Sequence, residues 1–133
     1  MTTPFRISFT VDGPPVPKQR AQSGKFGSYY PERGPNSRRL DYPSYKELVR
    51  VQCAYALQAL DHPRCEVGWL WGLKVTAWVG AGDGDNIAGS FADALQGILW
   101  ENDSQIRHWE CDVIRTKPKE YRGATILAWT LEE

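Results

Sequence analysis

The chain is predicted to fold as a single α+β domain, a small mixed β-sheet with two packed helices in the order β-α-β-α-β-β. Its 133 residues match the size of one domain spanning residues 1–133, and 41% hydrophobic residues with six Trp can form a core. Several segments alternate apolar with polar side chains, as half-buried strands do, and two others show helical spacing.

The first half of the chain is expected to hold two strands and a helix. Apolar side chains alternate with polar ones from Phe5 to Val11, which predicts a strand that ends at the Gly-Pro-Pro of residues 13–15. Residues 43–60 are predicted to be helical, with an apolar stripe formed by Val49, Cys53, Leu57 and Leu60. The next strand has one apolar face, formed by Trp69, Trp71, Leu73, Val75, Ala77 and Val79.

The second half is expected to hold a helix at 86–100 and strands at 106–116 and 124–131, with a turn near 119–123. At ~100° per residue, one helix face is apolar, with Ile87, Phe91, Ala94, Leu95, Ile98 and Leu99. The other face holds Asn86, Gly89, Ser90, Asp93, Gln96, Gly97 and Trp100. Asp93 therefore points the same way as the start of the helix.

Charge is distributed unevenly along a chain whose formal net charge is zero. Residues 1–50 carry nine Lys and Arg against four Asp and Glu, and residues 51–133 carry seven against twelve. A basic first part offers cations for phosphates, and an acidic remainder offers carboxylates for a metal ion, as a metal-dependent nuclease requires. Chance asymmetry in a soluble protein explains the charge alone equally well. Residues 13–41 show no periodicity and hold many of the cations, and so long an irregular segment is usually functional.

Several classes of protein are disfavoured. Cys53, Cys65 and Cys111 show no C-x-x-C spacing, so neither a disulfide framework nor a zinc knuckle is expected. His62 and Cys65 stand three apart, but no second pair completes a zinc site. No apolar run approaches the ~20 residues of a membrane span, and residues 1–6 do not resemble a signal peptide. We therefore expect a cytoplasmic protein with no membrane partner.

The most informative stretch is acidic and lies between the second predicted strand and the second predicted helix. Residues 83–86 have the sequence D-G-D-N, and Asp103 follows the helix. If extended geometry persists beyond the strand, Asp83 and Asp85 leave the same face roughly 7 Å apart at Cα. Two such carboxylates suit one hard cation such as Mg²⁺, which prefers oxygen ligands. The turn after the helix can return Asp103 toward them.

Each acidic residue also has a purely structural explanation. Asp85 could cap the helix, and Asp83 could belong to a turn beside glycine. Asp93 could be an ordinary solvated residue, and Asp103 could belong to a helix-ending turn with Asn102. Taken singly these explanations are stronger, but the joint pattern is much less common by chance.

This joint pattern resembles the RusA family of Holliday-junction resolvases, whose motif is approximately D-x-D-N-x-x-K-x-x-x-D-A-L followed by D-D-x-Q-I. The chain has D-G-D-N from Asp83, D-A-L from Asp93 and N-D-S-Q-I from Asn102. Residues 13–20, G-P-P-V-P-K-Q-R, are similar to the family's G-x-P-x-x-K-x-R, with Tyr-Pro at 30–31 and Tyr45 following. The resemblance covers nearly the whole chain, and the combined motif is specific.

The resemblance implies phosphodiester hydrolysis in branched DNA, with a four-way junction as the partner. Asp83, Asp85 and Asp103 would hold Mg²⁺, with Mn²⁺ as an alternative ion, and together with Lys18 they form the expected catalytic set. Asn86 and Asp93 would support these ligands. The expected DNA-binding cations are Lys18, Arg20, Lys25, Arg38 and Arg39, which would engage phosphates and fix register.

Two positions depart from the family motif. Gly89 stands where the family has a lysine implicated in catalysis, and Asn102 replaces the first of the paired late aspartates. Lys18, Lys74 or Lys117 could supply the missing cation, and the motif-bearing loop favours Lys18. Two alternatives therefore stay open: a junction-binding protein with weak or lost catalysis, and a related nuclease that acts on flaps or other branched DNA. A structural or regulatory protein with no DNA role is left only if the carboxylates fail to converge.

A homodimer is expected, because two strands of like polarity must be cut and one chain carries one acidic constellation. The resemblance implies the same, and it implies a bacterial protein or one encoded by a phage or prophage in a bacterial host. An apolar face around Trp69 and Trp71 could contribute to the dimer interface, although these residues could equally fill the core.

Overall fold

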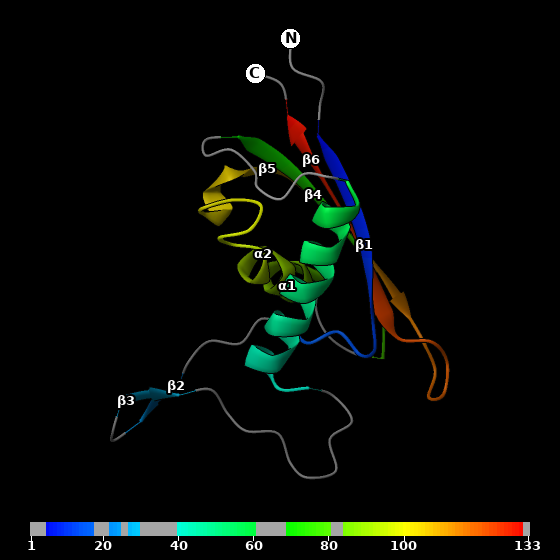
Figure 1. Ribbon diagram of the computed structural model, residues 1–133. Helices are drawn as coiled ribbons and strands as arrows, with labels where there is room; N and C mark the ends of the chain where they lie inside the picture. The colour runs from blue at the N-terminus through cyan, green and yellow to red at the C-terminus, as the bar shows by residue number, and fades with distance from the viewer. Residues whose placement is uncertain are drawn as a thin grey trace.

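The structure is a computed structural model that describes residues 5–17, 22–24, 27–29, 40–60, 69–80 and 84–131, with the backbone alone at 22–24, 27–29, 84 and 85. The fold is α+β in the predicted order β-α-β-α-β-β, with one additional small hairpin (Figure 1). The elements are β1 (Arg6–Asp12), β2 (Gln22–Gly24), β3 (Gly27–Tyr29), α1 (Tyr42–Ala59), β4 (Leu70–Val79), α2 (Gly84–Ala94), the 3₁₀ turn η1 (Asp103–Gln105), β5 (Ile106–Arg115) and β6 (Gly123–Leu131).

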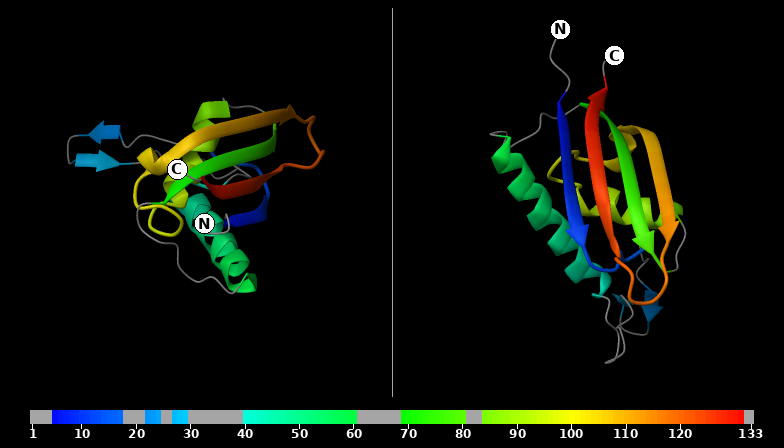
Figure 2. Two further views of the ribbon diagram at one scale, coloured as in Figure 1. Left: turned by 90° about the horizontal axis from the view of Figure 1, so that it is seen from above. Right: turned by 90° about the vertical axis from the view of Figure 1, so that its right-hand side faces the viewer.

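The four long strands form one mixed sheet in the order β1-β6-β4-β5. Strand β6 is antiparallel to both its neighbours, β1 and β4, whereas β5 is parallel to β4. Strands β1, β4 and β5 therefore all finish at one end of the sheet, which we call the lower end because it lies at the bottom of Figure 1. Both α1 and α2 lie on the same face of the sheet, and no described helix covers the other face (Figure 2).

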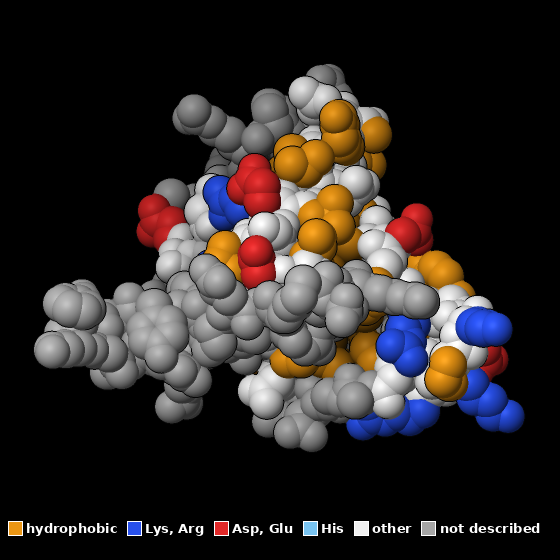
Figure 3. Space-filling view, turned by 90° about the horizontal axis from the view of Figure 1, so that it is seen from below, with side chains coloured by type: hydrophobic (Ala, Val, Ile, Leu, Met, Phe, Trp, Pro, Cys, Tyr) orange, Lys and Arg blue, Asp and Glu red, His pale blue; other side chains and the backbone are white. Residues whose placement is uncertain are grey.

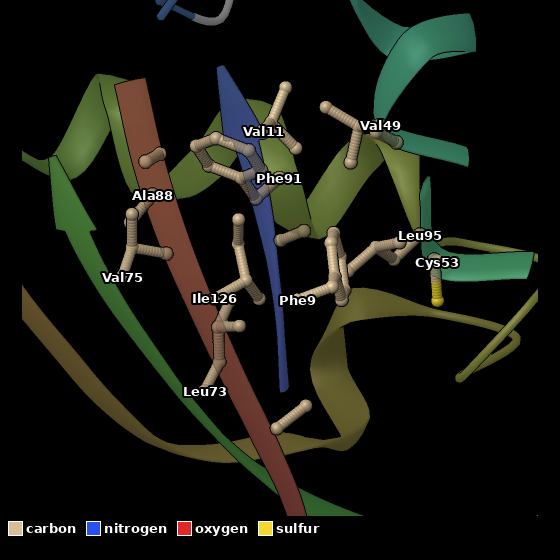
Figure 4. Packing of buried hydrophobic residues seen from close by; sticks show 14 of the residues in the cluster. Phe9, Val11, Val49, Cys53, Leu73, Val75, Ala88, Phe91, Leu95 and Ile126 are labelled. Atoms are coloured by element: carbon tan, nitrogen blue, oxygen red, sulfur yellow. The ribbon is translucent and has the colours of Figure 1, made fainter. Parts of the chain in front are cut away.

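The core lies between the sheet and the two helices. The predicted inner face of β4 is confirmed, since its alternate side chains from Trp71 to Val79 are at most 3% exposed. Figure 4 shows Phe9, Leu73 and Ile126 from the sheet packed near Phe91 and Leu95. The aromatic face expected to contribute to a dimer interface is instead part of this core: Trp71 is fully buried, and Trp69 is partly buried against it.

Helix α1 begins and ends close to the predicted positions. The Asp41 carboxylate caps its first turn by accepting a hydrogen bond from the Ser44 backbone N–H at 2.8 Å. The predicted apolar stripe is buried as far as Leu57. Leu60 is the exception, because the helix ends at Ala59 and the Leu60 side chain is 50% exposed. None of the helices in the described segments is long and apolar enough to cross a membrane.

Helix α2 is shorter than predicted, because it ends at Ala94 rather than near Trp100. Gly97 adopts φ +89°, a left-handed conformation that a continuing helix cannot contain. The chain turns there and carries Trp100 back into the core, where its indole Nε1–H donates to the Ala92 carbonyl at 2.9 Å. The predicted polar face was therefore wrong at Trp100, and also at Ser90, which is buried.

A short antiparallel hairpin formed by β2 and β3 lies within the segment that was predicted to be irregular. Each of its strands is only three residues long and consists largely of Gly and Ser. Such strands are too short to show apolar alternation, so the sequence pattern contained no signal for them.

Replacing Gly97 tests whether this left-handed turn ends α2. An added Cβ at Gly97 meets nothing within 4 Å, so Gly97→Ala should destabilise the protein through backbone conformation alone, by about 1 kcal/mol. Gly97→Asn should cost less, because Asn tolerates the left-handed region better. Urea unfolding of the three proteins measures both costs. Equal stability of all three would show that the positive φ carries no penalty.

Candidate functional site

The D-G-D-N motif lies where β4 ends and α2 begins. Strand β4 ends at Val79, residues 81–83 lie outside the described residues, and α2 begins at Gly84. Asp83 is thus not described, and only the backbone of Asp85 is described. Asp85 lies in the first helical turn rather than in an extended segment, so the expected extended geometry does not reach it. The positive end of the helix dipole favours negative charge at this position.

Asp103 lies in a rigid, exposed turn immediately before β5. The Asn102 side chain accepts a hydrogen bond from the Ser104 backbone N–H at 2.9 Å. The Gln105 side-chain oxygen accepts from the Asn102 backbone N–H at 3.1 Å, which completes a capping box. The Gln105 amide also donates to the Trp69 carbonyl at 2.8 Å, and this bond fastens the turn to the start of β4.

This turn explains one of the two departures from the family motif. Asn and Asp cap helical turns about equally well, so Asn102 retains the capping role that an aspartate would have. Ile106 is buried, which accounts for the apolar residue that ends the motif. The exposed Asp103 carboxylate forms no hydrogen bond or ion pair with another described residue, so the described contacts give it no structural role.

The described residues do not bring the three predicted metal ligands together. Because β4 and β5 are parallel, Ile106 pairs with Trp71, and Asp103 therefore lies near the start of β4. Residues 81–83 follow the other end of this strand, whose ten residues span roughly 30 Å. Among the described residues, no three or more His, Cys, Asp or Glu are grouped so as to hold a metal ion. A shared site therefore remains a prediction, since it depends on side chains outside the described residues.

Asp93 joins the two helices. Its carboxylate accepts a hydrogen bond from the Tyr42 hydroxyl at 2.6 Å and pairs with the Lys46 ammonium at 2.9 Å. One turn further along α1, the Arg50 guanidinium donates to the Ala94 carbonyl at 2.8 Å, at the end of α2. These contacts fix α2 on α1, and α2 carries Asp85 in its first turn. Whether Asp93 also supports metal ligands remains a prediction, as does the same role for Asn86, which is exposed on α2.

The predicted DNA-binding cations Lys18, Arg20, Lys25, Arg38 and Arg39 all lie outside the described residues. The segment that leads to the first of them is described, because residues 13–17 follow the end of β1 and include the fully buried Val16. Strands β1 and β4 both finish at the lower end of the sheet, so the basic and the acidic motif segments leave the sheet from the same end.

The two described candidates for the missing family lysine lie in different places. Lys74 projects from the helix-free face of the sheet, 4.0 Å from Glu110 and 3.8 Å from Asp112. On the same face, a 2.9 Å hydrogen bond from His108 lowers the pKa of the Glu110 carboxyl. Lys117 lies in the loop between β5 and β6, at the lower end of the sheet.

From the sequence, a turn was predicted in this β5–β6 loop, residues 116–122, and only Lys117 was given a possible function there, as one candidate for the missing lysine. The signal was nevertheless present, because residues 115–122 hold four cations: Arg115, Lys117, Lys119 and Arg122. The Thr116 backbone N–H donates to the Val79 carbonyl at 2.9 Å, so the loop begins beside the end of β4. A cationic loop thus lies next to the start of the acidic segment.

Removing the Asp93 carboxylate should loosen the contact between the helices. Asp93→Ala deletes a hydrogen bond and an ion pair that are both largely shielded from water, so we expect a loss of about 1–3 kcal/mol in urea unfolding. Asp112→Ala is the matched control, because this carboxylate is 65% exposed and its pairing with Lys74 is long, so its loss should cost at most about 0.5 kcal/mol. Equal losses in the two variants would contradict the structural role given to Asp93.

Comparison with known proteins agrees with the motif pattern. The family model for the endodeoxyribonuclease RusA matches residues 12–122, which include both motif segments, α1, α2 and the β5–β6 loop. No curated protein matches the chain. Since the match covers most of the 133 residues, the chain belongs to the RusA family of endodeoxyribonucleases.

Proposed function

We propose that this protein is a divalent-metal-dependent endonuclease that resolves four-way DNA junctions by paired, symmetric nicks. The main support for the proposal is that, in a chain of this family, the two motif segments begin at the same end of the sheet. One segment follows β1 toward Lys18 and Arg20, and the other follows β4 through Asp83 to Asp85. The segment with cations that attract DNA phosphates and the segment with Asp83 and Asp85, which suit a metal ion, thus both begin at the lower end of the sheet.

The proposed ligand set fits a hard cation. Asp83, Asp85 and Asp103 offer only carboxylate oxygens, which Mg²⁺ and Mn²⁺ prefer. The Asp103 carboxylate is exposed and unbonded among the described residues, so its oxygens are available to an ion. The N-terminal position of Asp85 in α2 favours the ionised carboxylate that a cation requires.

When bound, the metal ion would activate a water molecule and neutralise charge that builds on the scissile phosphate. The three carboxylates orient that ion, while Lys18 and Arg20 hold neighbouring phosphates and fix the register of the DNA. Asp93 supports this arrangement from a distance, because its bonds to Tyr42 and Lys46 fix the helix that carries Asp85.

A second candidate function is junction binding with weak or lost catalysis, and Gly89 favours it. Gly89 lies in α2 one turn after Asp85 and offers no cation where the family has a lysine. Purified protein incubated with a synthetic four-way junction, in Mg²⁺ or in EDTA, separates the candidates. Nicked duplex products that require Mg²⁺ support the resolvase, whereas a stable complex without products supports the binding protein. Faster cleavage of a flap substrate would favour the related nuclease.

The first functional prediction concerns the metal ligands. Asp85→Asn removes a negative charge without changing side-chain volume, so it should abolish Mg²⁺-dependent cleavage while junction binding is retained or strengthened. Cleavage is followed on labelled junctions, and binding is followed by fluorescence anisotropy in EDTA. Asp112→Asn, which changes an exposed carboxylate on the helix-free face, is the control and should cleave normally. Normal cleavage by Asp85→Asn would remove this residue from the proposed site.

The proposed resolvase is a two-fold dimer, because two strands must be cut at symmetry-related positions. The strand register gives a second reason. The pairing of β5 with β4 places Asp103 near the start of β4, whereas Asp83 follows the end of β4 in the sequence. Within one chain, these two residues therefore belong to opposite ends of the strand. A site that uses Asp103 together with Asp83 and Asp85 is most simply completed across the dimer.

Subunit mixing tests both parts of this proposal. Light scattering should give about twice the chain mass of 15.1 kDa. Asp85→Asn and Asp103→Asn subunits should each be inactive alone, but their mixture should nick one strand of the junction, because one of the two shared sites then keeps all its carboxylates. If the mixture stays inactive although heterodimers form, each site is built within one chain. A monomer that still makes paired cuts would refute the dimer.

A further inference from the structure

The β5–β6 loop forms the most cationic described part of the lower end of the sheet. Residues 115–122 contain four Lys and Arg and a single acidic residue, Glu120. The side chains of Arg115, Lys117 and Lys119 are exposed, and Arg122 is partly exposed. Figure 3, which views the molecule from below, shows a group of Lys and Arg side chains on the side where Figure 1 places this loop.

Hydrogen bonds and a ring contact hold the loop in a defined position. Besides the bond from Thr116 to the end of β4, the Arg122 carbonyl accepts a hydrogen bond from the Gly13 backbone N–H at 3.0 Å. The Tyr121 hydroxyl donates to the Asp12 carboxylate at 2.8 Å, and this bond raises the pKa of the phenol. The Tyr121 ring also packs edge-on against Trp78, with 5.8 Å between ring centroids. The loop is therefore tied to β1 and β4, the two strands from which the motif segments depart.

Arg122 lies especially close to the acidic segment. A Cβ added at Gly80 would lie 2.5 Å from an Arg122 guanidinium nitrogen, so this guanidinium packs directly on the Gly80 backbone. Gly80 is three residues before Asp83. A phosphate bound at this end of β4 would thus meet a cation already in place.

The turn at the tip of the loop presents a lysine in an unfavourable conformation. The Glu120 backbone N–H donates to the Lys117 carbonyl at 3.1 Å, which places Pro118 and Lys119 at the two central positions of a turn. Lys119 has φ +74°, and it is the only residue other than glycine with a positive φ among the described residues. The second central position of such a turn favours Gly or Asn, so stability alone does not explain a lysine there.

The only carboxylate of the loop is engaged within the same turn. The Glu120 side chain accepts a hydrogen bond from the Lys117 backbone N–H at 2.6 Å. Glu120 therefore braces the turn, while the Lys119 side chain extends into solvent. An exposed cation on this hydrogen-bonded turn, with other cations on both sides, suits the regular negative charge of a nucleic-acid backbone.

We propose that the β5–β6 loop binds backbone phosphates of the branched DNA beside the cleavage site, with Lys119 as its outermost contact. This inference rests on the proposed function, since it assigns a further DNA contact to the same site. With this loop, the proposed DNA-binding cations come from the C-terminal half of the chain as well as from the first third, where the sequence motifs placed them.

Lys119→Gly separates this role from a structural one, because it removes the cation and relieves the backbone strain at the same position. The variant should unfold at the same temperature as the wild type or a higher one. It should nevertheless bind a four-way junction several-fold more weakly, and the slope of log K against log salt should flatten by about one. Binding is measured by anisotropy in EDTA between about 50 and 200 mM salt. Lys119→Arg, which keeps the charge, should retain the wild-type slope.

Arg6→Ala provides the matched control. It removes one exposed positive charge at the start of β1, which is the opposite end of the sheet, so its salt slope should equal that of the wild type. An unchanged affinity and slope in Lys119→Gly overturns the inference and leaves the proposed function intact if the wild type still cleaves junctions. Equal weakening by Arg6→Ala and Lys119→Gly also overturns it, because net charge alone would then explain the loss. A wild-type protein that neither binds nor cleaves junctions defeats both proposals.

Discussion

The need to cover the inner face of β4 governs the layout of this molecule. Five alternate side chains from Trp71 to Val79 are almost completely buried, so both helices have to lie on the same side of the sheet. Because β4 is flanked by a parallel and an antiparallel neighbour, its direction also decides where every other strand ends. The departure of the basic and acidic segments from the same end of the sheet is thus a result of how the core is packed.

The contact between the two helices fixes the position of α2, the helix that carries Asp85. Tyr42, Lys46 and Arg50 follow one another at intervals of one helical turn on α1, and each contacts either Asp93 or the carbonyl groups at the end of α2. Helix α2 is short and carries Asp85 in its first turn, so any rotation of this helix would move Asp85. Side chains remote from the proposed chemistry therefore hold the helix on whose first turn Asp85 lies.

The long elements could be predicted from the sequence because their periodicity has a direct physical cause. Apolar and polar side chains alternate in β1 and β4 because one face of each strand is buried. The apolar stripe from Val49 to Leu57 marks the buried face of α1. The end of α2 could not be predicted in this way, because the apolar residues beyond it, Leu99 and Trp100, reach the core through a turn at Gly97 instead of a continuing helix. A helical wheel assumes one axis, and it assigned the buried Trp100 to the polar face although it placed Leu99 correctly.

The candidate site was predictable only in part, for a related reason. Motif spacing identifies Asp85 and Asp103, but distance along the chain does not reveal that parallel pairing of β4 and β5 sets their segments near opposite ends of a strand. Asp93 was assigned to the site by helix geometry, whereas its carboxylate contacts Tyr42 and Lys46 of α1, which the spacing within one helix cannot show. Apart from Lys117, the cations of the β5–β6 loop were not singled out, because their position beside the ends of β1 and β4 follows from the strand pairing and not from the sequence pattern.

The pairing of β1 with β6 has a consequence for how this chain folds. Arg6 lies opposite Trp129 and Asp12 opposite Gly123, and among the described strands β6 is the only neighbour of β1. During synthesis β1 leaves the ribosome first, but it has to wait for more than a hundred further residues before it can complete its ladder. Until then its apolar residues, including Phe9, lack the neighbouring strand β6. Contacts between segments so distant in the sequence form slowly. The pairing of β1 is therefore completed only after β6 has been made.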